Sequence, residues 1–207
     1  QVSLKRSEEF IAEAAHRVRT PLAIVRTQAD VTLHRVEKEQ NRKALRDIVR
    51  AIDESSRAAG QLLDHAMVTF RADDLDKERV DLTKLAKSSL EQLRPLAELR
   101  DIELIADLDV AVSVQVDPIL IQNAVHNVLD NAIKYTPLLG QIQVSVQTTA
   151  RHAQIIVTDS GPGFPDGGKS LLTQRFQRGG NAVGVVGSGL GLTIVRDVMA
   201  AHDGTLE

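Results

Sequence analysis

The sequence predicts an α+β protein in which an N-terminal helical hairpin is followed by a two-layer α/β sandwich. Over the first third of the chain, apolar residues recur at steps of three and four, as on the seam of supercoiled helices. After a short acidic stretch, helical segments and alternating strand-like segments follow one another. Ten of the 13 glycines then fall between Gly161 and Gly191, as in a mobile loop that covers a ligand.

Composition narrows the function classes. The 207 residues include no cysteine, which excludes disulfides and thiol chemistry and fits a reducing cytosol. The net charge of -3 gives no sign of nucleic-acid binding or of adhesion to anionic membranes. No apolar run approaches the roughly 18 residues of a membrane span. We therefore expect membrane contact only through a sensor region before Gln1.

Each predicted helix of the hairpin has one continuous seam. The seams consist of Ile11, Ala15, Val18, Leu22, Val25, Ala29, Thr32 and Val36, and of Leu45, Ile48, Ile52, Ser55, Ala59, Leu62, Ala66 and Thr69. The steps continue across Pro21, so we expect one helix with a kink there. A polar break at 37–41 makes the helices antiparallel. Because two hairpins together form a four-helix bundle, we expect a homodimer; a hairpin packed on its own C-terminal domain is the alternative.

The predicted domains are a hairpin over 1–72, a linker over 73–79, and a second domain over 80–207. In the second domain, patterning predicts helices over 82–99, 117–135 and 190–202, and strands over 102–106, 112–116, 141–148 and 153–158.

The glycine-rich segment has two ends with different chemistry. Asp159 follows a strand directly and precedes Gly161 and Gly163, whereas Gly187, Gly189, Gly191 and Leu192 open a helix. Backbone N–H groups at a helix N-terminus favour an anion, and phosphate is the natural candidate. A flexible surface loop has the same composition, but an acid paired with a phosphate cradle favours a nucleotide site. No Walker A sequence or dinucleotide fingerprint is present.

Polar residues also line one face of the helix over 117–135. Asn123, Asn127, Asn131 and Lys134 recur at helical spacing. Amide oxygens suit Mg²⁺ and a lysine suits phosphate. A solvated polar face is the simpler interpretation of this helix alone. On the first helix, His16 flanks the seam and should be exposed. A lone helical histidine is usually a surface or capping residue, but an imidazole can also be a nucleophile. No pair of histidines has zinc-ligand spacing.

In this order, the three elements resemble the histidine kinases of two-component systems. Residues 10–25 resemble the family's H box, 122–135 the N box, 159–163 the G1 box, 171–178 a shorter F box, and 187–192 the G2 box. The residues around His16 and at 26–29 are also similar to sensors of tricarboxylate transport. The resemblance implies a sandwich of the GHKL ATPase type that is truncated at its C-terminus. It also implies the cytoplasmic portion of an inner-membrane bacterial sensor.

The resemblance implies a role for each matching residue. His16 is the phospho-acceptor, Asn131 and Asn127 hold Mg²⁺, and Asp159 accepts from the adenine amino group. The remaining residues of the implied ATP site are Lys134, Tyr135, Gly161, Gly163, Gly187, Gly189, Gly191 and Leu192. The implied reactions are autophosphorylation of His16 by ATP, transfer to an aspartate of a response regulator, and dephosphorylation of that regulator.

Two positions near His16 bear on this function. Arg17 stands where the family usually has an acid, and a guanidinium cannot act as a base; we therefore predict Glu13 as the base. Thr20 either positions the water that dephosphorylates a partner or caps the kink at Pro21. Rival interpretations are a weak or inactive kinase acting as a nucleotide-sensing phosphatase, and a gyrase-like or chaperone-like ATPase. The latter class has an acid at the position of Asn127 and no hairpin.

Overall fold

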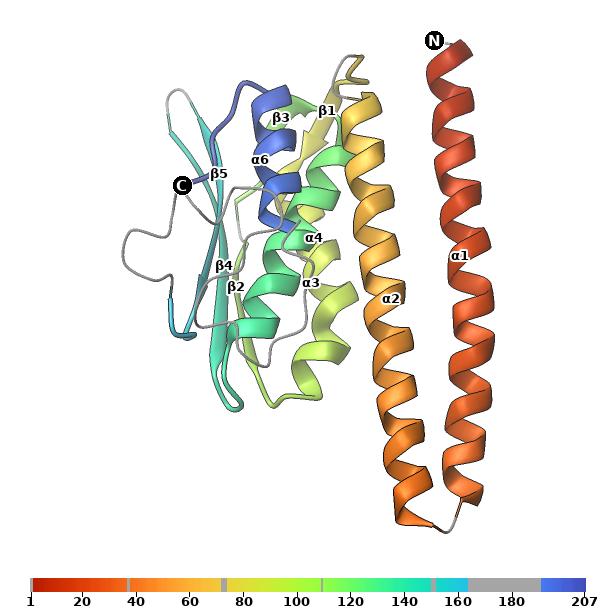
Figure 1. Cartoon of the computed structure of the whole chain (residues 1–207). Coiled ribbons are helices and arrows are strands. Elements are labelled where there is room, and N and C mark those ends of the chain that lie inside the picture. Colours follow the sequence, from red (N-terminus) through yellow and green to blue (C-terminus); the bar gives the residue numbers. More distant parts are fainter. Residues whose placement is uncertain (1, 37, 72–73, 109, 150–151, 164–190) are drawn as a thin grey trace. The chain divides into compact units, whose positions relative to one another are not determined.

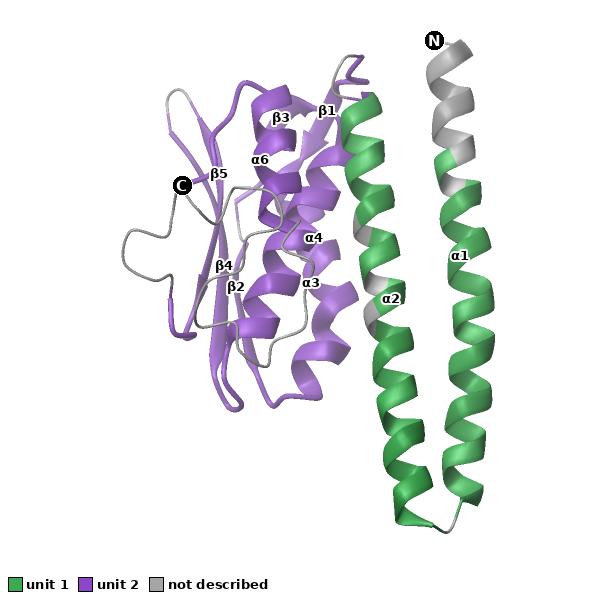
Figure 2. Ribbon diagram, viewed as in Figure 1, with its two compact units in different colours: residues 1–70, 186–188 green, residues 71–185, 189–207 purple. Residues whose placement is uncertain are grey.

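The computed structural model describes residues 2–36, 38–71, 74–108, 110–149, 152–163 and 191–207. These residues divide into two compact units, one ending at Phe70 and one starting at Arg71 (Figure 2). The first unit is a helical hairpin and the second is an α/β domain, as the sequence predicts. None of the helices in these ranges is long and apolar enough to cross a membrane.

The hairpin consists of α1 (Val2–Arg35) and α2 (Glu39–Arg71), which run antiparallel (Figure 1). Helix α1 continues through Pro21, in agreement with the unbroken heptad pattern. The turn between the helices is shorter than predicted, because α2 already begins at Glu39. An ion pair between Glu39 and Arg46 stabilises this first turn. Across the hairpin, the Arg26 Nε atom lies 3.3 Å from Asp53 Oδ1.

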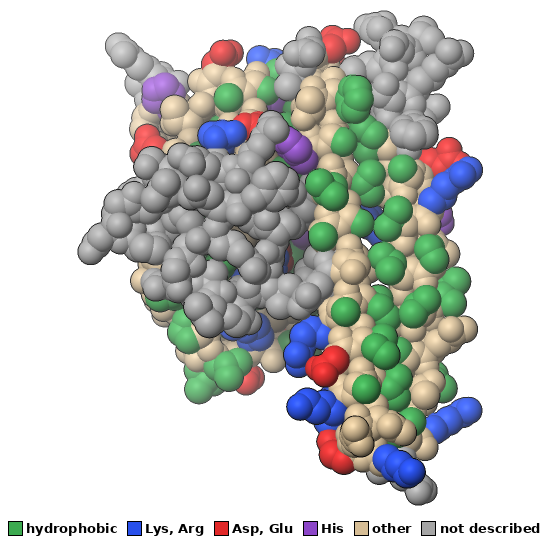
Figure 3. All heavy atoms as spheres, in the orientation of Figure 1, with side chains coloured by type: hydrophobic (Ala, Val, Ile, Leu, Met, Phe, Trp, Pro, Cys, Tyr) green, Lys and Arg blue, Asp and Glu red, His purple; other side chains and the backbone are tan. Residues whose placement is uncertain are grey.

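The predicted seam is only partly covered within one chain. Ile11 and Ala29 are buried. Four other seam residues remain 38–55% exposed: Val18, Val25, Ile48 and Leu62. Figure 3 shows hydrophobic side chains along both helices of the hairpin. A helix buries its apolar face against a partner when one is present, so this hairpin has an apolar face suited to a second hairpin.

The second unit contains two sheets and three described helices. Strands β1 (Glu78–Asp81) and β3 (Ser113–Val116) pair antiparallel. The other sheet has the order β2-β4-β5, in which β2 (Glu103–Asp107) is parallel to β4 (Gln141–Thr148) and β5 (Ala153–Asp159) is antiparallel to it. Helices α3 (Leu82–Glu98), α4 (Pro118–Tyr135) and α6 (Gly191–Ala201) cover one face of this sheet (Figure 1).

One strand was not predicted. Strand β1 begins at Glu78, inside the stretch that we interpreted as a loop. Its sequence is polar and only four residues long, so no local alternation of apolar residues marks it. Its pairing with β3 stabilises it instead.

Aliphatic side chains form the core between the helices and the three-stranded sheet. The largest fully buried members of this core come from α4, β4 and α6: Leu120, Leu129, Ile142, Val144, Ile194 and Val198. Strand β4 alternates, with Ile142, Val144 and Val146 buried and Gln141 and Gln143 exposed. Each of α3 and α4 begins with an aspartate cap, Asp81 and Asp117, whose side chain accepts two backbone N–H groups. The helices that carry the polar residues are therefore anchored on a rigid core.

Candidate functional site

His16 lies exposed on α1, off the buried face of the hairpin. Its Nε2 atom is 3.5 Å from the Oγ1 atom of Thr20, one helical turn later. The imidazole of His16 and the hydroxyl of Thr20 lie on the same face of α1 and together form a polar surface that a substrate can reach. The structure thus brings His16 and Thr20 together, as helical spacing predicts.

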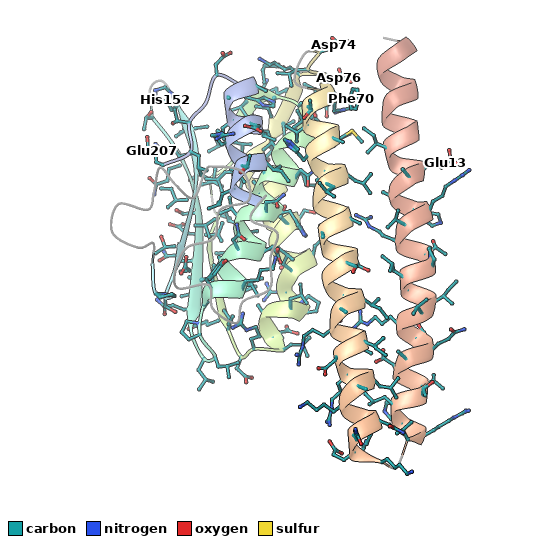
Figure 4. All side chains as sticks on the ribbon, viewed as in Figure 1. Glu13, Phe70, Asp74, Asp76, His152 and Glu207 are labelled. Carbon is teal, nitrogen blue, oxygen red and sulfur yellow. The ribbon has the colours of Figure 1, made fainter. Side chains whose placement is uncertain are left out.

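Glu13 is engaged by Arg17. The Arg17 Nε and Nη2 atoms donate to Glu13 Oε1 at 3.1 and 2.7 Å, and both side chains are largely exposed. Glu13 points away from α2 (Figure 4). Glu13, the predicted base, and Arg17, the residue that departs from the family pattern, therefore form one ion pair on the outer face of α1.

Asn127 and Asn131 meet the first residue of α6. A Cβ atom added to Gly191 would lie 3.2 Å from Asn127 Oδ1 and 3.3 Å from Asn131 Nδ2. Glycine therefore leaves room between the start of α6 and the two amides. Because the first backbone N–H groups of a helix lack intrahelical partners, this corner combines amide oxygens with an anion-favouring helix end.

The orientation of Asn127 is defined by a backbone contact. Its side chain is buried, and its Nδ2 atom donates to the Asn123 carbonyl at 2.9 Å. The amide oxygen consequently faces Gly191. A buried oxygen held beside a second amide matches the oxygen ligands that Mg²⁺ takes in proteins. In the described ranges, no three His, Cys, Asp or Glu side chains gather as metal ligands.

The last turn of α4 holds Lys134 and Tyr135. Lys134 forms an ion pair with Asp130, one turn earlier, and both side chains are mostly buried. Tyr135 is 37% exposed, so its ring is accessible. The Arg100 guanidinium donates to the carbonyls of Ile133, Lys134 and Thr136 at this end of the helix.

Asp159 ends β5 and shapes the turn that follows it. Its Oδ1 atom accepts the Gly161 backbone N–H at 2.8 Å. A Cβ atom at Gly161 would lie 2.6 Å from Asp159 Oδ1 and 2.9 Å from the Tyr135 carbonyl oxygen. Gly163 has φ +67°, in the region that favours glycine. The Asp159 turn is thus packed against the end of α4.

Some predicted residues cannot be placed. Gly187, Gly189 and the segment 171–178 lie outside the described residues, as does the proposed lid. Leu192 is in the first turn of α6 and is half-buried.

Long-range partners of α4 were missed from the sequence. A helix starting at Asp117 was predicted, but the ion pair of Asp117 with Arg71 and its contact with His202 were not. These partners are 46 and 85 residues away, so no spacing pattern could reveal them. Arg100 was missed for the same reason.

Comparison with known proteins agrees with the two-unit organisation. The His Kinase A (phospho-acceptor) domain matches residues 6–74. The histidine kinase-, DNA gyrase B- and HSP90-like ATPase domain matches residues 116–207. A solved mycobacterial sensor histidine kinase, MprB, is 38% identical with a TM-score of 0.55, and the match covers 61% of this chain and 80% of that one.

The chain belongs to the histidine kinases. Its ATPase-type domain is the ATP-binding part of the family. Full-length ShkA, solved in complex with AMPPNP, shares the fold at 23% identity and a TM-score of 0.63, over 93% of this chain and 41% of that one.

Curated histidine kinases match over the whole chain. The signal transduction histidine-protein kinase/phosphatase MprB of Mycolicibacterium vanbaalenii is 34% identical over 99% of this chain, and the sensor protein kinase PmrB of Pseudomonas aeruginosa is 31% identical over 100%. The chain spans 43% of the length of each. These relatives do not support the predicted closeness to tricarboxylate-transport sensors, because they are named as MprB and PmrB kinases.

Proposed function

We propose that the chain uses ATP to phosphorylate its own His16 and passes the phosphoryl group to an aspartate of a response regulator. The observation that carries the proposal is the exposed His16 on a hairpin that matches the phospho-acceptor domain. The matching ATPase domain supplies the phosphoryl donor. In this proposal, residues 1–72 are the phosphotransfer hairpin, 73–79 the linker, and 80–207 the catalytic domain.

ATP would bind between the end of α4 and the start of α6. Asp159 accepts a hydrogen bond from the adenine amino group, and Tyr135 lines the base pocket. Lys134 contacts a phosphate after leaving Asp130. Such an exchange is favourable because a doubly charged phosphate group is a stronger partner for an ammonium than one carboxylate is. Gly161, Gly163 and Gly191 leave room for close approach of the nucleotide.

Asn131 and Asn127 would hold Mg²⁺. The fit rests on the buried Asn127, whose oxygen faces the Gly191 corner because its Nδ2 atom is already bonded to Asn123. When bound, Mg²⁺ neutralises charge on the phosphates. The asparagines contribute by holding their oxygens at this corner before the nucleotide arrives, which lowers the cost of ordering the site.

The proposed reaction begins when a His16 ring nitrogen attacks the γ-phosphorus. The new N–P bond forms as the bond to the β,γ-bridging oxygen breaks, and that oxygen leaves with its electron pair on ADP. The proton of the ring passes to a base. In the transfer step, a carboxylate oxygen of a receiver aspartate attacks the phosphorus. The O–P bond of an acyl phosphate forms as the N–P bond breaks, and the electron pair of that bond returns to the imidazole.

Glu13 is the proposed base, and Arg17 competes for it. An exposed i,i+4 ion pair contributes only about 0.3–0.5 kcal/mol, so the Glu13 carboxylate can leave Arg17 at little cost. His16 is on the following turn, within reach of a different Glu13 rotamer. We infer that Arg17 slows this step without preventing it.

The proposed assembly is a homodimer built on the hairpin seam. The exposed apolar residues Val18, Val25, Ile48 and Leu62 support it, because a second hairpin would cover them. A response regulator receiver would dock near Leu22 and Arg26, beside His16. We place this portion in the cytoplasm, where ATP is available. We propose no nucleic-acid partner, in keeping with the net charge of -3.

Dephosphorylation of the regulator is a second proposed activity. Thr20 Oγ1 lies 3.5 Å from His16 Nε2, so a hydroxyl stands beside the position of the incoming phosphoryl group. The MprB relative is named as a kinase/phosphatase, which favours the same pair of activities here. A protein with weak kinase activity would act mainly in this second role.

The decisive experiment is incubation with γ-labelled ATP and Mg²⁺. We expect an acid-labile, alkali-stable label that is lost in His16→Ala and in Asn131→Ala. His34→Ala is the matched control, because His34 is also exposed on α1 and its Nδ1 atom contacts the Asp30 carbonyl of its own helix at 2.8 Å. Label retained in His16→Ala would disprove the acceptor assignment. No label despite tight nucleotide binding would favour the phosphatase role.

A further inference from the structure

A buried charged cluster lies at the N-terminal end of α4, away from every residue given a role above. We propose that Arg71 and Asp117 are positioning residues for the nucleotide site: together with His202 they hold α4 and α6 in register. This inference rests on the proposed function of that site. Both residues belong to the second unit, although Arg71 is also the last residue of α2.

Arg71 and Asp117 form an ion pair in which one guanidinium nitrogen contacts both carboxylate oxygens. The Arg71 Nη1 atom lies 2.7 Å from both carboxylate oxygens, and the two side chains are 8% and 0% exposed. A buried ion pair contributes little net stability compared with apolar residues of the same size. It does enforce geometry, because each charge must stay on its partner to avoid being buried alone.

The Asp117 carboxylate also begins α4. Its Oδ1 atom accepts from the backbone N–H groups of Ile119 and Leu120 at 3.0 and 3.2 Å, and Oδ2 accepts from Asp76 at 3.3 Å. The same two oxygens therefore join the end of α2, the following linker and the first turn of α4. Moving the carboxylate would disturb all three at once.

His202 joins α6 to this cluster. Its Nε2 atom accepts the Asp117 backbone N–H at 3.0 Å, and Nδ1 donates to the Val198 carbonyl at 2.8 Å. Both bonds require a neutral ring with its proton on Nδ1. The residue just after α6 is thus attached to the residue just before α4.

The other end of α6 lies at the proposed Mg²⁺ site. Gly191, its first residue, adjoins Asn127 and Asn131 in the middle of α4. The two helices consequently run antiparallel, side by side (Figure 1). Because α6 is a short helix that moves as one unit, its attachment through His202 sets the distance from Gly191 to the Asn127 and Asn131 side chains. The charged cluster therefore controls the width of the nucleotide corner from the opposite end of the helix pair.

Asp81 provides a matched control within the same domain. It caps α3 with the same geometry, accepting from Thr83 and Lys84 at 3.0 and 3.2 Å. Among the described residues, its charged partner is the exposed Lys84 at 3.9 Å, and α3 carries no proposed nucleotide residue. An Asp→Asn substitution there removes the charge of a cap of the same kind without disturbing the α4–α6 pair.

The test measures binding of a non-hydrolysable ATP analogue with Mg²⁺ to the full chain, at a temperature where every variant is folded by circular dichroism. The variants are Asp117→Asn, Arg71→Met, Arg71→Lys, the Asp117→Asn/Arg71→Met double variant, Asp81→Asn and Asn131→Ala. We expect Kd to rise about tenfold in Asp117→Asn and Arg71→Met, a size typical of outer-sphere positioning groups. Arg71→Lys should restore part of the affinity. Asp81→Asn should leave Kd unchanged and Tm nearly unchanged, because asparagine caps a helix about as well as aspartate.

The double variant separates positioning from stability. In the double variant neither charge is buried alone, so its Tm should recover relative to the single variants. Its Kd should stay raised, because the contact between Arg71 Nη1 and the Asp117 carboxylate is missing. Unchanged Kd in all folded Arg71 and Asp117 variants would overturn the proposal, as would Kd that returns together with Tm. If Asp117→Asn does not fold, the Arg71→Lys and Arg71→Met values decide. Wild-type protein that binds no analogue, or an Asn131→Ala variant that binds normally, would instead contradict the proposed nucleotide site.

Discussion

Arg17 holds Glu13 through two hydrogen bonds to a single carboxylate oxygen, with donor–acceptor distances of 3.1 and 2.7 Å. The pair occupies the turn of α1 that also carries His16. Arg17, which is permanently charged and adjoins His16, therefore pairs with Glu13, the nearest candidate base on the same helix. The proposed autophosphorylation depends on how this competition is resolved.

Replacing Glu13 with Gln should slow labelling of His16 by about tenfold, because an amide cannot take the ring proton. The initial rate with γ-labelled ATP measures the effect. Glu39→Gln is the control, since Glu39 is also an exposed carboxylate paired with an arginine, at the far end of the hairpin. Equal rates in Glu13→Gln and the wild type would remove Glu13 from the mechanism.

Replacing Arg17 with Glu should accelerate labelling by about tenfold or more, because the new carboxylate adjoins His16 directly. The variant also loses the Glu13 ion pair and gains a like-charge contact, so the free energy of unfolding should fall by no more than about 1 kcal/mol. Arg94→Glu, which breaks the exposed Glu91 pair on α3, controls for charge reversal. A slower Arg17→Glu enzyme would mean that Arg17 itself assists the reaction.

Replacing Thr20 with Ala should reduce dephosphorylation of the receiver that accepts the label, while leaving labelling of His16 within about twofold. Thr20→Ser keeps the hydroxyl and should retain activity. Thr27→Ala is the matched control, because Thr27 is an exposed threonine of α1 that bonds to the Ala23 carbonyl. Loss of labelling in Thr20→Ala would instead favour a role in the helix around Pro21.

Replacing Gly191 with Ala should weaken binding of Mg²⁺-ATP by about tenfold, although alanine favours a helix. The added Cβ would lie 3.2 Å from Asn127 Oδ1 and push the start of α6 away from the amides. Gly60→Ala on α2 is the control, since its nearest contact would be Arg19 Nη2 at 3.9 Å. That variant should be about 0.5–1 kcal/mol more stable, with unchanged affinity.

Replacing Ile48 with Glu should dissociate the homodimer, because Ile48 is 48% exposed on the unpaired seam. Burying a charge there opposes the roughly 1.5–3 kcal/mol that a buried isoleucine contributes. Sedimentation velocity measures the change. Leu99→Glu, at an 81% exposed leucine of the second unit, should stay dimeric. A dimeric Ile48→Glu protein would place the interface elsewhere.

Local patterns explain most of what could be predicted. The heptad steps required two long helices, and they outweighed Pro21 because the seam on both sides belongs to the same face. The Asp117-Pro118 pair is a typical helix start. The strand predicted over 141–148 has the bounds of β4, although the buried Ser145 interrupts its alternation. The order of boxes identified the family. These signals succeed because each depends on residues a few positions apart.

Contacts between distant segments could not be read in this way. Strand β1 exists because it pairs with β3, and its own four residues carry no apolar alternation. Arg71, Asp117 and His202 meet across 46 and 85 residues of chain, so their pairing became visible only once α4 and α6 were packed. The pairing of Glu13 with Arg17 likewise became visible only in the structure. Composition and periodicity thus specify the elements and the chemistry, whereas folding selects which charges are buried together, because that choice depends on three-dimensional proximity.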